Sequence, residues 1–259
     1  MNLSRCFPSR QLLFVFAVFV FGNLFNPGAN RANAQQATLV TKDGKTQSVK
    51  IIGVSGGNLQ VQVEAGKIGI PLASIAQVNN LPAPPELAAA QAAFEAKDFQ
   101  KAFTADKAVL DKYKGLPTDW AQQAATLLGD IYVAKKNLDL AESAYREFER
   151  LYPNAGPAQL AVGLARIAVA RNDFATAKQR VDPILADALK EKNPPRSLAL
   201  IYSQAFFISG QVKENGGDFS GALEDYLRTV AVFWQDRVAV AAAQERADAL
   251  RKAHAVTAP

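Results

Sequence analysis

The sequence has 259 residues, of which 49% are hydrophobic and 20% are charged, and its formal net charge is +5. This composition is typical of a soluble globular protein, and it argues against a disordered chain, a collagen-like fibre or a protein with many membrane spans. The single Cys and single His exclude a disulfide framework, a Cys/His metal site and a Cys–His nucleophile pair.

Residues 1–34 have the features of a secretory signal peptide. Arg5 and Arg10 precede an apolar run over residues 12–25, and Ala32-Asn33-Ala34 offers small residues where a signal peptidase would cleave. The run of about 14 residues is shorter than the roughly 20 needed to cross the hydrocarbon core. We therefore expect cleavage and no permanent membrane span. Retention of the segment as an anchor is the alternative.

Cleavage after Ala34 would change the charge of the protein. It would remove Arg5, Arg10 and Arg31 and no acidic residue, so that the net charge of +5 would fall to +2. A nucleic-acid partner requires a basic stripe that neutralises several phosphates together, and the small remaining charge disfavours one. Cleavage would also remove Cys6, the only cysteine, which fits an oxidising compartment. We expect an exported protein of the periplasm or cell envelope.

Residues 35–81 alternate apolar and polar side chains with the period of two that strands show. Leu59, Val61 and Val63 share one face of the clearest alternation. Turn signals, such as Asp43-Gly44, divide the region into four or five short strands. Closure of so small a sheet would remove most of its open edge. The pattern is similar to an SH3-like or Sm-like β-barrel, which we expect to rest on the remaining chain or to self-associate.

A change of pattern follows at residues 82–85. This segment is the predicted linker, because its three prolines in four residues cannot continue a strand ladder. From residue 86 to residue 259 the apolar positions recur with the period of helices. The sequence thus predicts an α+β protein in which a small N-terminal β-barrel of about five short strands precedes an all-α domain.

A short phrase recurs four times in the helical region. Each copy has a capping Asp or Asn, a large apolar residue beside it, and an Ala one turn later. The copies occupy residues 98–102, 137–141, 173–177 and 218–222, and their alanines are 39, 36 and 45 residues apart. The phrase predicts four helical hairpins, in which the Asp or Asn begins the second helix and the Ala lets the first helix approach closely.

Other positions keep the same register. Gly129 and Gly210 lie twelve residues before an Ala of the phrase, and Tyr145 and Tyr226 lie four after it. Small and aromatic residues at helical spacing are far more often core than ligand site, so we assign these residues to packing.

The second copy contains a wider set of such positions: Leu128-Gly129, Tyr132, Ala141, Tyr145 and Pro153. At these spacings the copy resembles the tetratricopeptide repeat family, and the resemblance extends over roughly residues 85–255. The other copies depart from the pattern, with Ala90 and Ala165 in the Gly column and Lys213 where Tyr is usual. The resemblance implies a solenoid of stacked hairpins. The helix predicted at 236–253 would be the capping helix that covers its last apolar face.

The resemblance also implies a binding groove, because the first helices of tetratricopeptide hairpins line a concave surface. The implied groove residues are, copy by copy, Leu87, Gln91 and Phe94; Gln123, Thr126, Asp130 and Val133; Gln159, Val162, Arg166 and Val169; Gln204, Phe207, Gln211 and Glu214. Three of these residues, Gln123, Gln159 and Gln204, occupy the same position in successive copies. We call them the amide column, and they would form an amide ladder for an extended peptide backbone. The alternative is that they are simply solvated. The family's Lys/Arg clamp for a C-terminal carboxylate is absent.

The sequence contains no catalytic motif, and we predict no catalytic residue, cofactor or metal. His254 lies five residues from the C-terminus, which is a poor position for a catalytic base. We predict a non-enzymatic scaffold that binds a protein or peptide partner in the groove. Two rivals remain: a structural component that forms homo-oligomers in an envelope complex, and an unrecognised carboxylate-dependent envelope enzyme, which would need an acid pair in a pocket.

Overall fold

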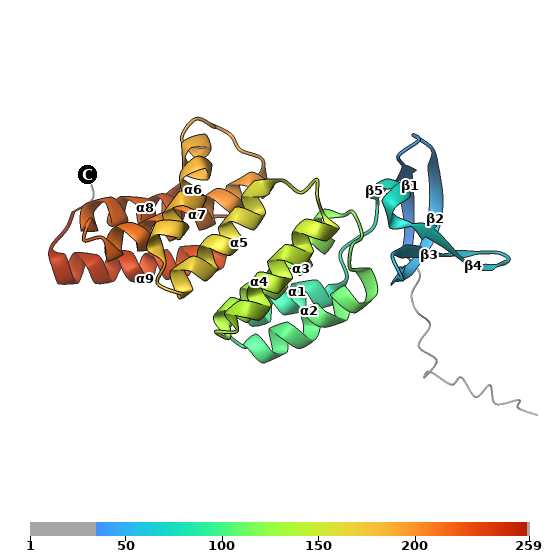
Figure 1. Cartoon of the computed structure of the whole chain (residues 1–259), viewed down its shortest axis with the longest axis horizontal. Coiled ribbons are helices and arrows are strands. Elements are labelled where there is room, and N and C mark those ends of the chain that lie inside the picture. The colour runs from blue at the N-terminus through green and yellow to red at the C-terminus, as the bar shows by residue number, and fades with distance from the viewer. Residues whose placement is uncertain (1–34, 258–259) are drawn as a thin grey trace, which may run out of the picture. The chain divides into compact units, whose positions relative to one another are not determined.

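The computed structural model describes residues 35–257, so the predicted signal segment 1–34 lies outside the described residues. The described chain has an α+β fold in which a five-stranded antiparallel sheet is followed by nine helices (Figure 1). None of these helices is long and apolar enough to cross a membrane. The described residues fall into one compact unit.

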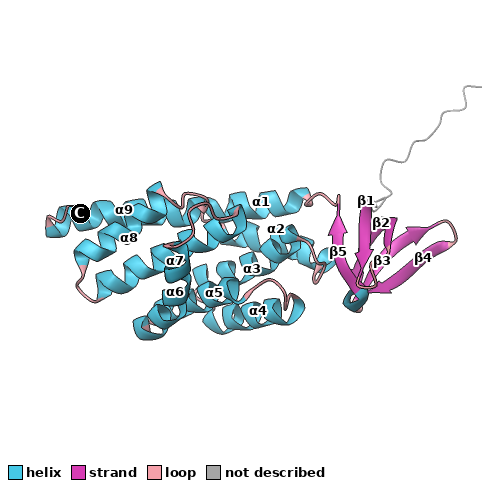
Figure 2. Ribbon diagram, turned by 90° about the horizontal axis from the view of Figure 1, so that it is seen from above, coloured by secondary structure: helices cyan, strands magenta, loops and turns pink. Residues whose placement is uncertain are grey.

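The sheet forms where the sequence alternates. Its strands are β1 (Gln35–Thr41), β2 (Thr46–Ser55), β3 (Asn58–Val63), β4 (Gly66–Pro71) and β5 (Ile75–Asn79), in the order β4-β3-β2-β1-β5 (Figure 2). Leu59 and Val61 of β3 point to one face and are at most 1% exposed, as are Leu39 and Ile51 of the neighbouring strands. β4 and β5 are the two edges of the sheet. Its closure into a barrel stays a prediction.

The helices begin at Pro85, the last residue of the predicted linker, where proline suits the first turn. They are α1 (Pro85–Glu95), α2 (Phe99–Tyr113), α3 (Asp119–Ala134), α4 (Leu138–Leu151), α5 (Pro157–Ala170), α6 (Phe174–Ala188), α7 (Arg196–Asn215), α8 (Phe219–Ala231) and α9 (Arg237–His254). Each helix contacts the next one in sequence. In addition, α1, α3, α5, α7 and α9 contact one another in turn.

The four recurring phrases form four turns with one geometry. The residue before the cap has a positive φ, between 60° and 79°, in every turn: Lys97, Lys136, Asn172 and Gly217. The next residue is the N-cap of the second helix: Asp98, Asn137, Asp173 and Asp218. Its amide donates to the carbonyl five residues earlier at 2.8–2.9 Å. The aspartate side chains also accept a bond from the first turn of their helix, whereas Asn137 does not.

The alanines of the phrase are buried in the packing of the helices. All four (Ala102, Ala141, Ala177 and Ala222) have 0% exposure. Around Ala141 the contact extends to three helices, because the Tyr145 ring of α4 lies against glycines of both α3 and α5. A Cβ atom on Gly129 would lie 2.6 Å from Tyr145 Cε1, and one on Gly163 would lie 2.5 Å from it. Gly210 and Tyr226 repeat this contact between α7 and α8. The prediction that these residues pack the core is confirmed.

The sheet and the first two hairpins share one hydrophobic core. Leu39 and Ile51 belong to the same buried cluster as Tyr113 of α2 and Ala124 of α3. The backbone of β2 approaches α2 so closely that a Cβ on Gly53 would lie 2.9 Å from the Lys112 carbonyl oxygen. The connection between sheet and helices is also tied down, since the indole nitrogen of Trp120 donates to the Leu81 carbonyl at 3.0 Å. The sheet therefore rests on the helical region.

Candidate functional site

A cavity with a volume of about 710 Å³ lies along one set of helices. Apart from Phe148 of α4, all its helical lining residues belong to α1, α3, α5, α7 and α9. These are the helices that contact one another in turn. The cavity is therefore a property of their stacking and not of one hairpin. Its size lies within the range of about 300–1,000 Å³ that is usual for ligand sites.

The cavity gathers most of the residues that the sequence assigns to the groove. These are Gln91, Phe94, Gln123, Thr126, Asp130, Val133, Gln159, Arg166, Gln204 and Phe207. Gln211 lies further along α7 and is not part of the lining. Glu214 instead accepts a bond from the Tyr226 hydroxyl at 2.6 Å and pairs with Arg246.

The assignment of Leu87 and Val162 to the groove is wrong. Leu87 is 3% exposed in the core that the sheet shares with the first hairpins. Val162 is 0% exposed and belongs to a buried cluster with Ala205 and Phe206 of α7. Val169 packs against the same cluster. These apolar side chains contribute more to stability when covered by a neighbouring helix than when left on a polar surface.

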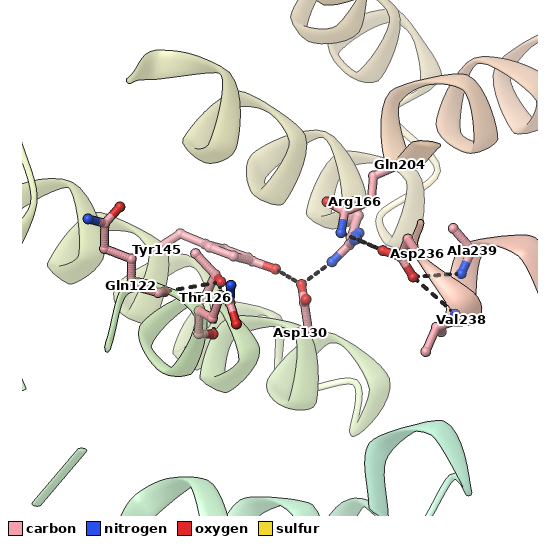
Figure 3. Close-up of polar contacts among 10 residues, drawn as sticks. Gln122, Thr126, Asp130, Tyr145, Arg166, Gln204, Asp236, Val238 and Ala239 are labelled. Carbon is pink, nitrogen blue, oxygen red and sulfur yellow. Dashed lines mark hydrogen bonds and ion pairs between the residues drawn. The ribbon is translucent and has the colours of Figure 1, made fainter. Parts of the chain in front are cut away.

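An ion network between three helices includes Asp130, Arg166 and Asp236, the least exposed charged residues of the lining (Figure 3). We call these three residues the floor of the cavity. Arg166 of α5 binds Asp130 of α3, and the Tyr145 hydroxyl donates to the same carboxylate oxygen. Another guanidinium nitrogen of Arg166 lies 4.0 Å from Oδ2 of Asp236. The side chains of Asp130, Arg166 and Asp236 are 16%, 23% and 14% exposed, so each charge requires an opposite charge beside it.

The network fixes the charge of Arg166. Burial opposes the charged guanidinium, but the carboxylates, Asp130 foremost, outweigh it and raise the pKa of Arg166. Burial, together with the charge of Asp130, raises the pKa of the Tyr145 hydroxyl well above its usual value. Tyr145 therefore stays a hydrogen-bond donor and Arg166 stays a cation at any physiological pH.

Asp236 connects the cavity to the last helix. Its Oδ1 atom caps α9 by accepting bonds from the amides of Val238 and Ala239, both at 3.0 Å. Its Oδ2 atom accepts a bond from the Gln204 amide nitrogen at 2.6 Å. This bond identifies Gln204 Nε2 as the donor, because a carboxylate only accepts. Gln204 is thus held in place. Within the described residues, the side chains of Gln123 and Gln159, the other two glutamines of the column, make no hydrogen bond.

Two amide oxygens in the cavity wall lack a donor. Gln204 Oε1 and Gln235 Oε1 are buried and have no hydrogen-bond partner among the described residues. A buried acceptor without a donor costs about 1–3 kcal/mol. Both oxygens therefore lack a donor from the described residues that surround this wall.

A third aspartate lies behind this network. Asp106 of α2 is 0% exposed, and neither carboxylate oxygen has a hydrogen-bond partner among the described residues. Burial, with a smaller effect from the charge of Asp130, raises the pKa of Asp106 to about 8. Asp106 stands four residues after Ala102, which is the position that Tyr145 has after Ala141. The first hairpin thus has a buried neutral acid where the second has a tyrosine.

Sequence reasoning missed Asp236, Gln235 and Asp106 as part of this region. The N-cap role of Asp236 is a local signal, since it directly precedes a predicted helix. Its bond to Gln204 joins residues 32 positions apart, and no local pattern reports such a contact.

The cavity offers limited chemistry. Asp130 and Asp236 form an acid pair of the kind that the enzyme alternative requires, but both carboxylates are ion-paired with Arg166. Asp106, with its raised pKa, is not part of the lining. Within residues 35–257, no group of three or more His, Cys, Asp or Glu side chains is placed to hold a metal ion.

Comparisons of this chain with protein-family models, with curated proteins and with solved structures find no match.

Proposed function

We propose that the protein is an exported, non-enzymatic scaffold that binds another protein, through an extended segment, in the cavity along α1, α3, α5, α7 and α9. The observation that carries the proposal is that the residues lining the cavity come from distant parts of the sequence. Residues far apart in sequence, such as Gln91 and Gln204 at a separation of 113 positions, reach one cavity because the first helices of successive hairpins contact one another. This is the arrangement expected of a tetratricopeptide-like solenoid with α9 as its capping helix.

Three further features belong to the proposal. Removal of residues 1–34 would release the protein into the periplasm or cell envelope. The sheet would close into a small barrel that supports the first hairpin. Catalysis is disfavoured because the acid pair of the cavity is bound by Arg166, and because Asp106, the carboxyl whose pKa suits a general acid, has 0% exposure.

Two glutamines of the amide column provide a test. Gln123→Ala combined with Gln159→Ala removes two groups that line the cavity without deleting a side-chain hydrogen bond within the described residues. Gln77→Ala combined with Gln179→Ala removes two exposed glutamines elsewhere and is the matched control. The wild-type protein and both variants would be used to capture partners from an envelope extract, with quantitative mass spectrometry of the bound proteins.

We expect one partner to be retained by the wild type and by the control, and to fall at least about tenfold with the cavity variant, which corresponds to about 1.4 kcal/mol. Equal capture by the cavity variant would refute the groove. A stable high-order oligomer in sedimentation, with no captured partner, would favour the homo-oligomeric alternative instead.

A further inference from the structure

The charges of the cavity are not balanced on its floor. Asp130 and Asp236 share a single cation, Arg166, so this partly buried cluster holds one negative charge in excess. Nearer the rim the charges compensate. Glu95 lies 3.9 Å from Arg237, and the exposed Asp119 and Arg196 have opposite signs. The surplus therefore belongs to the floor, where low exposure to solvent weakens screening.

Two neutral amide oxygens near the cluster have no hydrogen-bond donor among the described residues. Gln204 Oε1 is fixed as an acceptor because its amide nitrogen is bound to Asp236, and Gln235 Oε1 is a second buried acceptor without a partner. The amide oxygens are closed off from the cavity, whereas the Asp130 and Asp236 side chains keep 16% and 14% exposure, so an incoming group with a positive charge would compensate the excess charge. A carboxylate would meet two aspartates at close range and would add a further acceptor.

Resting on the proposed function, we propose that the cavity selects a partner segment by a Lys or Arg side chain, whose ammonium or guanidinium group binds between Asp130 and Asp236. The cation would share these carboxylates with Arg166. The groove would thus prefer basic segments and reject acidic ones and free C-terminal carboxylates.

The test uses the purified protein and an array of capped, fluorescent octapeptides of varied sequence. Two variants remove one negative charge each and keep the side-chain shape: Asp130→Asn, and Asp236→Asn, in which asparagine still serves as an N-cap. Glu149→Gln is the matched control, because Glu149 is an exposed acid of α4 outside the cavity. Circular dichroism and a thermal melt establish that each variant is folded, and either aspartate variant suffices for the test.

We expect the peptides bound by the wild type to be enriched in Lys or Arg at one position. The best of them should bind about tenfold more weakly to either aspartate variant and less than about twofold more weakly to the control. Its affinity for the wild type should fall as the salt concentration rises.

The outcomes separate this inference from the proposed function. Peptides that bind with no preference for Lys or Arg, or with a preference for Asp or Glu, would overturn the selection by charge and leave the groove standing. Unchanged affinity in both aspartate variants would do the same. Failure of every peptide to bind, while the control protein is folded, would count against the groove itself.

Discussion

At the scale of single residues, the centre of the helical region is a contact between one aromatic ring and two glycines. Tyr145 fills the space that side chains at Gly129 and Gly163 would occupy, and its hydroxyl donates to Asp130 in the ion network. Because the ring is 1% exposed and touches α3 and α5 at once, it sets the spacing of two helices that line the cavity.

Replacement of Gly163 by Ala should therefore destabilise the protein, although alanine is the better helix former by roughly 1 kcal/mol. A Cβ atom 2.5 Å from the Tyr145 ring forces the ring or α5 to move, and overpacking of this kind costs about 1–3 kcal/mol. Urea unfolding of Gly163→Ala measures the net loss.

The matched control places the same change in a Tyr145→Leu background, where the ring is gone. There Gly163→Ala should be neutral or stabilising. An equal loss in both backgrounds would show that the ring is not the cause.

Asp106 makes stability depend on pH. Its pKa is about 8 in the folded protein, against about 3.9 in an unfolded chain. Between these values the folded state holds a proton that the unfolded state has released, so the free energy of unfolding should fall as the pH rises, by up to about 1.4 kcal/mol per pH unit. Asp106→Asn should remove this contribution.

The measurement is urea unfolding of both proteins at intervals from about pH 5 to about pH 8. The variant should gain stability relative to the wild type over this range. A constant difference between the two would mean that Asp106 is ionised in the folded protein.

At the scale of elements, the four hairpin turns share one backbone geometry but not one residue at the strained position. Gly217 adopts a positive φ without cost, Asn172 tolerates it, and Lys97 and Lys136 have a side chain that opposes it. The sequence difference among the turns therefore predicts a difference in stored strain.

Lys136→Gly should accordingly raise the free energy of unfolding by about 1 kcal/mol, as should Lys97→Gly, whereas Asn172→Gly should gain less. Gly217→Ala should lose about the same amount. Thermal or urea melts of the four variants give the ranking, and a Lys136→Gly variant less stable than the wild type would contradict the strain argument.

The elements show what a sequence can predict. The capping roles of Asp98, Asp173 and Asp218 were predictable because an N-cap acts within its own first turn. The burial of the alanines followed from the period of the repeat. Gly163 was not predicted as a contact of Tyr145, since the third copy places Ala165 in the glycine column and the second glycine reaches the ring only when α5 stacks on α4.

The site was predictable to a similar degree and for the same reason. Repeat arithmetic placed Gln123, Gln159 and Gln204 in one cavity because they occupy one column on successive first helices. The same repeat spacing wrongly assigned Val162 to the groove, because this apolar side chain is covered by α7. It did not reach Asp236, which lies in a loop between helices and belongs to no column.

At the scale of the whole molecule, a single buried cluster runs through the sheet and the first two hairpins, so we expect them to unfold as one cooperative unit. The Trp120–Leu81 hydrogen bond and the close contact of Gly53 with α2 lie at the same boundary. Loss of packing in the sheet should therefore reach the helices.

Leu39→Ala tests this coupling. Leu39 is 0% exposed in β1, so its truncation should cost about 2–5 kcal/mol. Hydrogen exchange should become faster for amides of α2 and α3 as well as for those of the sheet. Faster exchange that stops at the sheet would show that the two regions unfold separately.

The double use of Asp236 has a consequence for how occupancy of the cavity would be detected. One oxygen begins α9 and the other holds Gln204, so a guest that draws this carboxylate toward itself also pulls on the first turn of the terminal helix. Trp234 stands two residues before Asp236 and is 64% exposed. We therefore expect the indole emission of Trp234 to shift when the cavity is filled, and this shift would be measured without an attached dye.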